Sequence, residues 1–327
     1  MSGDAETATA DIFFFSAGTQ SIMSSDGDVE EAADEVCASC GKAEVDEINL
    51  KLCACNLVKY CSVDCQTNHR PQHKKACKKR LAEIRENNLF TQPEESDIGE
   101  CPICCLPLPL DWSKSRLSSC CCKWICIGCS HATKKRELEQ GLGHKCPYCR
   151  EAVPNTKEEV EKNWMKRVKA SDPVALNQMG SKCEREGDFE EAFEYFTKAA
   201  KLGNVDAHYN LSLMYHEGKG VEKDIKKELY HLEEASIGGH PWARFNLANL
   251  EGRNGREDRA TKHLIIAAKL GHDESLEVVK EGFMDGSASK EDFEAALRGH
   301  QAAVDATKSR QREEAEKAKR EGSGLFR

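Results

Sequence analysis

The chain has 327 residues, and its 47 basic and 56 acidic side chains give a net charge of −9. Hydrophobic residues make up 39% of the chain, and no run of about 18 apolar residues occurs, which excludes a membrane-spanning helix. A length of this order indicates about two to three domains.

The first stretch, residues 1–36, is an acidic segment with nine Asp or Glu and no Lys or Arg. It shows no hydrophobic period, so we expect a disordered tail. Phe13, Phe14 and Phe15 form a short apolar run, but no basic residue precedes them, which argues against a secretory signal. Without a targeting signal, we expect a cytoplasmic or nuclear protein.

Cysteine determines the class of the protein. Of 18 cysteines, 17 lie between Cys37 and Cys149, most of them in close pairs. A secreted disulfide scaffold is the alternative interpretation, but the chain has neither a signal peptide nor the small size of such scaffolds. The pattern therefore favours metal binding in a reducing compartment.

The first cysteine cluster, residues 37–80, carries enough ligands for two tetrahedral zinc ions. Its eight potential ligands are Cys37, Cys40, Cys53, Cys55, Cys61, Cys65, His73 and Cys77. Zinc would stabilise a module of this size, which has too little apolar content to fold otherwise.

The motifs CASCGK (37–42), KYCSVDCQ (59–66) and HKKAC (73–77) resemble the MYND zinc finger. The resemblance implies interleaved ligation, and proline-containing peptides of partner proteins rather than DNA as ligands. One zinc would be held by Cys37, Cys40, Cys61 and Cys65, and the other by Cys53, Cys55, His73 and Cys77. Two features depart from the family: the spacing Cys53-x-Cys55, and Arg70 where the family often has Trp.

Two features near the end of this cluster have simple explanations. His69 lies four residues before His73 and is expected to be an exposed helix residue rather than a ligand. The run 70–80 has six basic residues and no acid. A solvated helix face is favoured over nuclear import or nucleic-acid binding, since no aromatic residues interleave. Residues 81–100 are expected to begin as helix and to end as an acidic linker around Pro93.

The second cysteine cluster, residues 101–150, resembles a RING module in its motifs CPIC (101–104), CIGC (126–129) and CPYCR (146–150). The resemblance implies two zinc sites in cross-brace order. One site would be Cys101, Cys104, Cys126 and Cys129, and the other two of Cys120, Cys121 and Cys122 with Cys146 and Cys149. We rank Cys120 and Cys121 slightly ahead, although Cys120 with Cys122 is sterically easier. Cys105 is expected to be a spare buried thiol. His131 and His144 are reserve ligands, although neither fits a RING ligand position well.

The RING resemblance also implies two contact residues. Ile103, between the first two ligands, would dock a ubiquitin-conjugating enzyme, and Arg150, just after the last ligand, would bridge to ubiquitin. Catalysis of this kind is by positioning. Either residue also has a simpler explanation, as a packing residue or a surface cation.

The C-terminal half is expected to be an all-α solenoid. Residues 157–169, within the segment 151–172, form a connecting helix, and the similar segments TKAAKLGN, LEEASIGGH and IIAAKLGH recur at intervals of 36 and 32 residues. The segment 207–240 resembles a Sel-one-like repeat, with Gly218 and Gly220 in its loop and Asp224 capping its second helix. Cys183 is expected to be buried.

We predict repeats over 173–305, in three units beginning near 173, 206 and 241, and a degenerate fourth at about 273–305. The charged tail 306–327 is expected to extend a helix and then fray.

The sequence therefore predicts a multidomain protein, with two small zinc-stabilised modules followed by an all-α helical-repeat solenoid and about four zinc ions. Its partners are expected to be proteins, with no membrane and with nucleic acid disfavoured. The favoured hypothesis is a RING-type ubiquitin ligase that recruits a substrate through the MYND finger or the repeats; the alternative is a non-catalytic adaptor in transcriptional regulation. A MYND-containing methyltransferase is disfavoured, since no Asn-His-Ser-Cys segment is present.

Overall fold

The computed structural model describes residues 36–43 and 50–322, so the predicted acidic tail lies outside the described residues except for Val36. The described residues form two compact units, which divide between Leu81 and Ala82. Among the described residues, no helix is both long enough and apolar enough to cross a membrane.

The first unit is a small module around two short antiparallel strands, β1 (Lys51–Leu52) and β2 (Lys59–Tyr60). Helix α1 (Val63–Phe90) begins just after β2 and continues into the second unit. The buried hydrophobic side chains of the module are Cys37, Leu50, Cys53, Cys55 and Tyr60. Three of these five are predicted ligands, so the core of this module consists largely of its candidate metal site.

The second unit begins with the end of α1, which packs on the solenoid. Arg244, whose side chain is fully buried, donates hydrogen bonds to the carbonyl oxygens of Leu89 (2.6 Å) and Thr91 (3.3 Å). The last turn of α1 has no basic residue of its own, so Arg244 supplies the cation that the carboxyl end of a helix favours. Residues 81–90 are therefore helical, and the extended linker begins after Phe90.

Residues 101–150 form a compact ββα module. Its elements are η1 (Trp112–Lys114), β3 (Ser115–Ser118), β4 (Lys123–Cys126) and α2 (Ile127–Glu139). The strands pair antiparallel, with Ser115 opposite Cys126. The buried core consists of Cys101, Leu108, Ile125, Cys126, Cys129 and Cys146. Here too, cysteine supplies most of the core.

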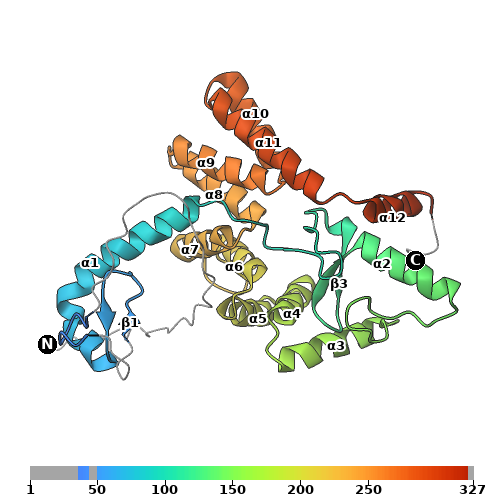
Figure 1. Ribbon diagram of the computed structural model, residues 1–327, viewed down its shortest axis with the longest axis horizontal. Helices are drawn as coiled ribbons and strands as arrows, with labels where there is room; N and C mark the ends of the chain where they lie inside the picture. Colours follow the sequence, from blue (N-terminus) through green and yellow to red (C-terminus); the bar gives the residue numbers. More distant parts are fainter. Residues whose placement is uncertain (1–35, 44–49, 323–327) are drawn as a thin grey trace. The chain divides into compact units, whose positions relative to one another are not determined.

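The remaining helices stack in chain order, as Figure 1 shows. They are α3 (Lys157–Lys169), α4 (Pro173–Glu186), α5 (Phe189–Lys201), α6 (Val205–Glu217), α7 (Ile225–Ile237), α8 (Pro241–Arg253), α9 (Glu257–Lys269), α10 (Asp273–Asp285) and α11 (Lys290–Ala306). Each pair α4–α5, α6–α7 and α8–α9 packs together, and α9 also packs on α10 and α11. The predicted all-α solenoid is confirmed.

The glycines near the end of the three recurring segments adopt left-handed backbone conformations. Gly203, Gly239 and Gly271 adopt φ values of 84°, 87° and 95°, a region that side-chain-bearing residues rarely adopt. In the middle repeat, Gly218 caps α6 in the left-handed conformation, and the Asp224 carboxylate accepts hydrogen bonds at the start of α7. Local sequence therefore sets the boundaries of the repeats.

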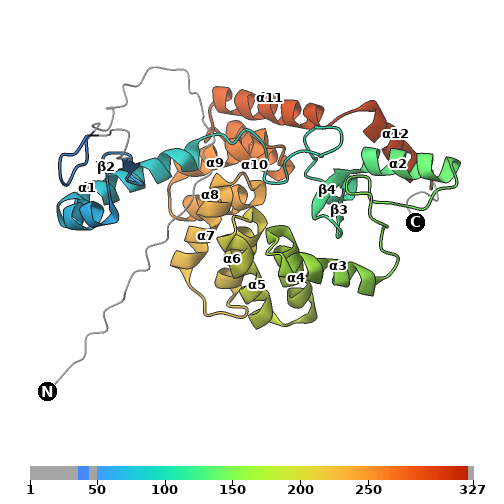
Figure 2. The ribbon, with the colours of Figure 1, turned by 60° about the horizontal axis from the view of Figure 1, so that its bottom comes forward.

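The C-terminal stretch differs from the expectation of a fraying helix extension. It forms a separate helix, α12 (Arg310–Arg320), which begins at Ser309 as N-cap and packs against α2. Figure 2 shows α12 beside α2. Two of its residues, Arg312 and Ala315, are buried in this contact. Packing against a distant segment, which the local charge pattern does not reveal, orders this stretch.

Candidate metal centres

The structure gathers the sixteen predicted ligand side chains into four groups of four. Within each group, the ligand atoms lie within 4.8 Å of one another. The groups are Cys37–Cys40–Cys61–Cys65, Cys53–Cys55–His73–Cys77, Cys101–Cys104–Cys126–Cys129 and Cys120–Cys121–Cys146–Cys149. These are the groups that the two family resemblances imply.

In the first unit, loops and the start of α1 supply the ligands. Cys65, His73 and Cys77 lie on α1, and their spacing places the last two on the same face, one turn apart. Sγ of Cys55 lies 3.1 Å from Nε2 of His73, and Sγ of Cys53 lies 3.8 Å from Sγ of Cys77. Cys53, the ligand with unusual spacing, is thus placed with its group.

In the ββα module, the pairs alternate between two groups. The first pair joins the third, with Sγ of Cys104 3.8 Å from Sγ of Cys126. The second joins the fourth, with Sγ of Cys121 3.9 Å from Sγ of Cys146. Cys122 instead adopts φ 56° and is buried away from the group. Of the three adjacent cysteines, Cys120 and Cys121 are therefore the two that the structure brings to Cys146 and Cys149.

The sulfur spacings fit tetrahedral zinc. A zinc–sulfur bond of about 2.3 Å places neighbouring sulfurs of a tetrahedron about 3.8 Å apart. The Cys40–Cys61, Cys61–Cys65, Cys104–Cys126 and Cys121–Cys146 sulfurs are separated by 3.6, 3.6, 3.8 and 3.9 Å. These four pairs are therefore spaced as a tetrahedral ion requires, whereas the Cys120 and Cys149 sulfurs lie closer together, at 3.3 Å.

Electrostatics also favours a cation in the groups that contain Cys77 and Cys121. Burial and the nearby Cys53 thiol raise the pKa of Cys77 to about 12, and burial and the charges of Cys146 and Cys149 raise the pKa of Cys121 to about 12. Four neighbouring thiols cannot all ionise at neutral pH unless a divalent ion compensates their charge. For the two groups of residues 37–77, the MYND match implies that this ion is zinc, which would stabilise the fold around the ligands.

Four residues near the groups are not part of them, and two of the four, His69 and Cys105, differ from the expectation in their exposure. His69 is half-buried rather than exposed, because its Nδ1 lies 2.9 Å from the Tyr60 hydroxyl. Cys105 is exposed rather than buried, because it adopts φ 53° in the turn after Cys104. His144 is no ligand in this arrangement, because its Nδ1 lies 3.0 Å from the Glu137 carboxylate. His131 is half-buried on α2 and joins neither group of four.

The two predicted contact residues of the ββα module have different surroundings. Ile103 is 41% exposed between the first two cysteines. Arg150 adopts φ 65°, and its Nη1 lies 3.4 Å from the buried Glu137 carboxylate. Ile103 is therefore free to contact a partner, whereas Arg150 already has one within the module.

A fifth polar group, which the sequence analysis missed, joins the linker to the solenoid. Asp97 in the linker lies beside Asp206 at the start of α6 and His240 at the start of α8. The His240 Nδ1 accepts a hydrogen bond from the Ala243 amide, so the ring proton of neutral His240 lies on Nε2, the nitrogen nearer Asp206. A protonated nitrogen is a poor metal ligand, so these groups form a carboxyl pair rather than a metal centre.

We expect Asp97→Asn to stabilise the solenoid at pH 8. Burial and the neighbouring Asp206 carboxylate raise the pKa of Asp97 well above its usual value of 3.8, and Oδ1 of Asp97 has no hydrogen-bond partner. A raised pKa means that the folded state loses stability as pH rises from about 4 through the folded pKa. Asparagine removes that loss, a gain on the order of 1 kcal/mol. Urea unfolding at pH 5.5, 7 and 8 measures it.

The matched control for this substitution is Asp258→Asn, at an exposed position in the first turn of α9, which should change stability little at any of these pH values. The gain from Asp97→Asn should shrink as pH falls. A variant that is less stable than the native chain at pH 8 would contradict the carboxyl-pair interpretation.

Comparison with known families identifies two parts of the chain. Residues 37–77 match the MYND finger, and residues 174–204, 205–240 and 243–272 match the Sel1 repeat. The chain thus contains a MYND finger and Sel1 repeats, and it is a zinc-binding protein built from protein-interaction modules.

Individual curated relatives match only a short stretch of the chain. The chain is 43% identical over 56 residues to HcpC of Helicobacter pylori, covering 17% of this chain and 19% of that protein. It is 39% identical over 54 residues to DAP3-binding cell death enhancer 1 of Rattus norvegicus, covering 16% and 11%. A solved Sel1 repeat protein from Oxalobacter formigenes aligns at 21% identity and a TM-score of 0.41, covering 54% and 72%. The chain thus spans less than a fifth of the length of these two curated relatives.

Proposed function

We propose that this protein is a zinc-dependent ubiquitin ligase in which residues 101–150 act as a RING-type module. The observation that carries the proposal is the alternation of its four cysteine pairs between two groups, with strands β3 and β4 and helix α2 between them. This is the cross-brace order of a RING. The module would position a ubiquitin-conjugating enzyme and its thioester rather than attack the substrate itself.

The surface of the module supports a docking role. Ile103 is 41% exposed and Tyr148, between the last two cysteines, is 47% exposed. Both are apolar-faced side chains on the metal-binding loops, next to ligands whose positions zinc would fix. Exposed apolar side chains on rigid loops are suited to a protein partner.

The rest of the chain would recruit the substrate. Sel1 repeats and a MYND finger are protein-interaction modules, and stacked helical repeats present extended surfaces for polypeptides. The expected substrates are therefore proteins with peptide segments that reach the finger or the solenoid.

The ubiquitination assay tests the proposal. The zinc-loaded chain, incubated with ubiquitin, activating enzyme and a broad panel of conjugating enzymes, should form ubiquitin chains with at least one of them. Ile103→Ala should reduce the rate at least about tenfold, since docking of the conjugating enzyme precedes catalysis. Leu138→Ala, at a 70% exposed position on α2, is the matched control and should leave the rate unchanged.

A non-catalytic adaptor is the second candidate, and the engagement of Arg150 favours it. The Arg150 guanidinium lies beside the Glu137 carboxylate, so it must leave this pair to contact ubiquitin. Chain formation by the native chain distinguishes the two functions, and in a ligase Arg150→Ala should abolish it. An adaptor forms no chains with any conjugating enzyme, but still binds proline-containing peptides when loaded with zinc.

A further inference from the structure

Helix α12 places a buried cation against one of the candidate metal centres. The Arg312 side chain comes from the C-terminal helix and is only 4% exposed. Its Nη2 lies 3.5 Å from Sγ of Cys104 and 3.1 Å from the Leu106 carbonyl oxygen. Its Nη1 donates to the carbonyl oxygens of Pro107 (2.6 Å) and Thr307 (2.7 Å). The guanidinium thus closes over the loop that follows the first cysteine pair.

The packing around Arg312 is too tight for an incidental contact. A Cβ added at Gly128, between Cys126 and Cys129, would come within 2.9 Å of the Arg312 amide nitrogen. Gln311 Oε1 lies 3.7 Å from Sγ of Cys129, so two neighbouring residues of α12 contact ligands of the same group. The glycine at position 128 therefore allows α12 to lie directly on the metal-binding turn.

Among the ion pairs of the described residues, none includes Arg312. Helix α12 nevertheless carries three acidic residues, and Glu321 follows its last turn. A buried cation without a counter-ion is strongly unfavourable. Four thiolates around one zinc ion carry a net charge of −2, and Cys104 brings that charge to the guanidinium.

We propose that the metal–thiolate centre of Cys101, Cys104, Cys126 and Cys129 is the counter-ion of Arg312, so that metal at this centre holds α12 in place. Without metal, no ion holds the four sulfurs around one point, and the loops on which Arg312 and Gln311 pack lose their support. Helix α12 then leaves α2. The ββα module thereby loses its contact with the helix that follows α11. This proposal rests on metal at this centre, but not on ligase activity.

Coupling of this kind is reciprocal. If metal stabilises the docked helix, the docked helix must retain the metal. Arg312 is therefore a positioning residue for one zinc of the four, through its N–H···S contact with Cys104, as outer-shell partners of metal ligands commonly are.

The experiment uses the full-length, zinc-loaded chain and three variants. Arg312→Met keeps most of the side-chain volume without the charge, and Arg312→Lys keeps the charge without the planar fork. Arg310→Met is the matched control, because Arg310 lies on the same helix with its side chain 92% exposed. Zinc content is measured first, and zinc release into a chromogenic chelator is then followed in time. Hydrogen exchange of residues 310–320 reports docking of α12.

We expect Arg312→Met to release one zinc per chain at least tenfold faster than the native chain, and to lose exchange protection across α12. Arg312→Lys should show zinc release and exchange protection between those of Arg312→Met and the native chain. Arg310→Met should match the native chain in both. With Co²⁺ in place of zinc, Arg312→Met should also shift the thiolate charge-transfer band, which a purely steric role would not. Unchanged zinc release and unchanged α12 protection in Arg312→Met would overturn the proposal.

Failure of the metal centre itself is distinguishable from failure of the proposal. A purified chain that carries no zinc bound by Cys101, Cys104, Cys126 and Cys129, assessed with Cys101→Ser as reference, contradicts the centre. A chain that carries this zinc, but whose α12 stays protected after the zinc is removed, contradicts only the role of Arg312. Ubiquitin-chain formation enters neither measurement.

Discussion

Removal of zinc by a strong chelator at neutral pH should unfold both cysteine modules and leave the solenoid helical. Structural zinc contributes about 10–16 kcal/mol per site in small zinc-binding peptides, which exceeds the stability of most whole domains. The cores of residues 37–77 and 101–150 consist largely of the proposed ligands. Without the ion, these thiols form a poor apolar core. Among the described residues, neither module has another hydrophobic cluster that could replace this core.

The solenoid should survive because its core has a different composition. The largest cluster contains Leu176, Phe196, Leu211 and Met214 with several alanines, and Cys183 is its single cysteine. Neighbouring repeats bury each other's apolar faces, so their stability does not require metal. Residues 174–272 should therefore keep their protection from hydrogen exchange.

Hydrogen exchange followed by mass spectrometry, before and after chelation, measures both outcomes in one sample. Peptides from 50–80 and 101–150 should lose protection, while peptides from α5 and α8 should not. Re-addition of zinc should restore the native pattern, which excludes irreversible damage. A front half that keeps its protection after complete metal removal would contradict the zinc-dependent fold.

The sequence predicts much of this architecture because its signals are local. Cysteine pairs separated by one to three residues, and glycines at intervals of 36 and 32 residues, mark the metal groups and the repeats without knowledge of the fold. The connecting helix is predicted over 157–169, and the structure has α3 over Lys157–Lys169. The Thr156 hydroxyl caps its start, a signal contained in the adjacent residues.

Contacts between distant segments could not be predicted in the same way. Arg312 lies more than 200 residues from Cys104, and Asp97 lies more than 100 residues from Asp206, so no spacing rule connects them. Arg312 reads in sequence as one charge of a solvated tail, and it is buried only because Gly128 leaves room for α12. Cys105 shows the reverse error: a thiol next to a ligand is expected to be buried, but the left-handed turn directs it to solvent.

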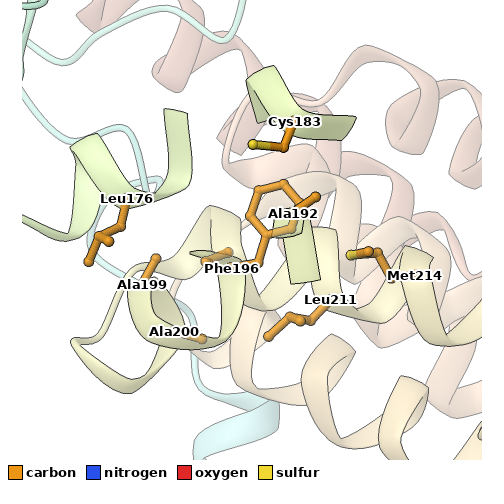
Figure 3. Close-up of a cluster of buried hydrophobic side chains, with 9 residues drawn as sticks. Leu176, Cys183, Ala192, Phe196, Ala199, Ala200, Leu211 and Met214 are labelled. Atoms are coloured by element: carbon orange, nitrogen blue, oxygen red, sulfur yellow. The ribbon is translucent and has the colours of Figure 1, made fainter. Parts of the chain in front are cut away.

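The largest single-residue effect on the solenoid is expected for Phe196→Ala, which should lower the free energy of unfolding by about 3–5 kcal/mol. The Phe196 ring is fully buried at the centre of the first repeat, as Figure 3 shows. Its neighbours include Ala192, Ala199 and Gly180, which are too small to fill the space that the ring leaves. The variant therefore loses the transfer free energy of the ring and also keeps a cavity.

Urea unfolding of the zinc-loaded chain, followed by helical circular dichroism, measures this loss, and Leu202→Ala is the matched control at the end of the same helix. Leu202 is 49% exposed, so its truncation removes little buried surface and should cost about 0.5 kcal/mol or less. The glycine at 180 explains why the site tolerates so little change, because a Cβ there would lie 2.6 Å from the Phe196 ring. Equal losses for the two variants would mean that the first repeat is not packed around Phe196, and that the solenoid's stability arises from the later repeats alone.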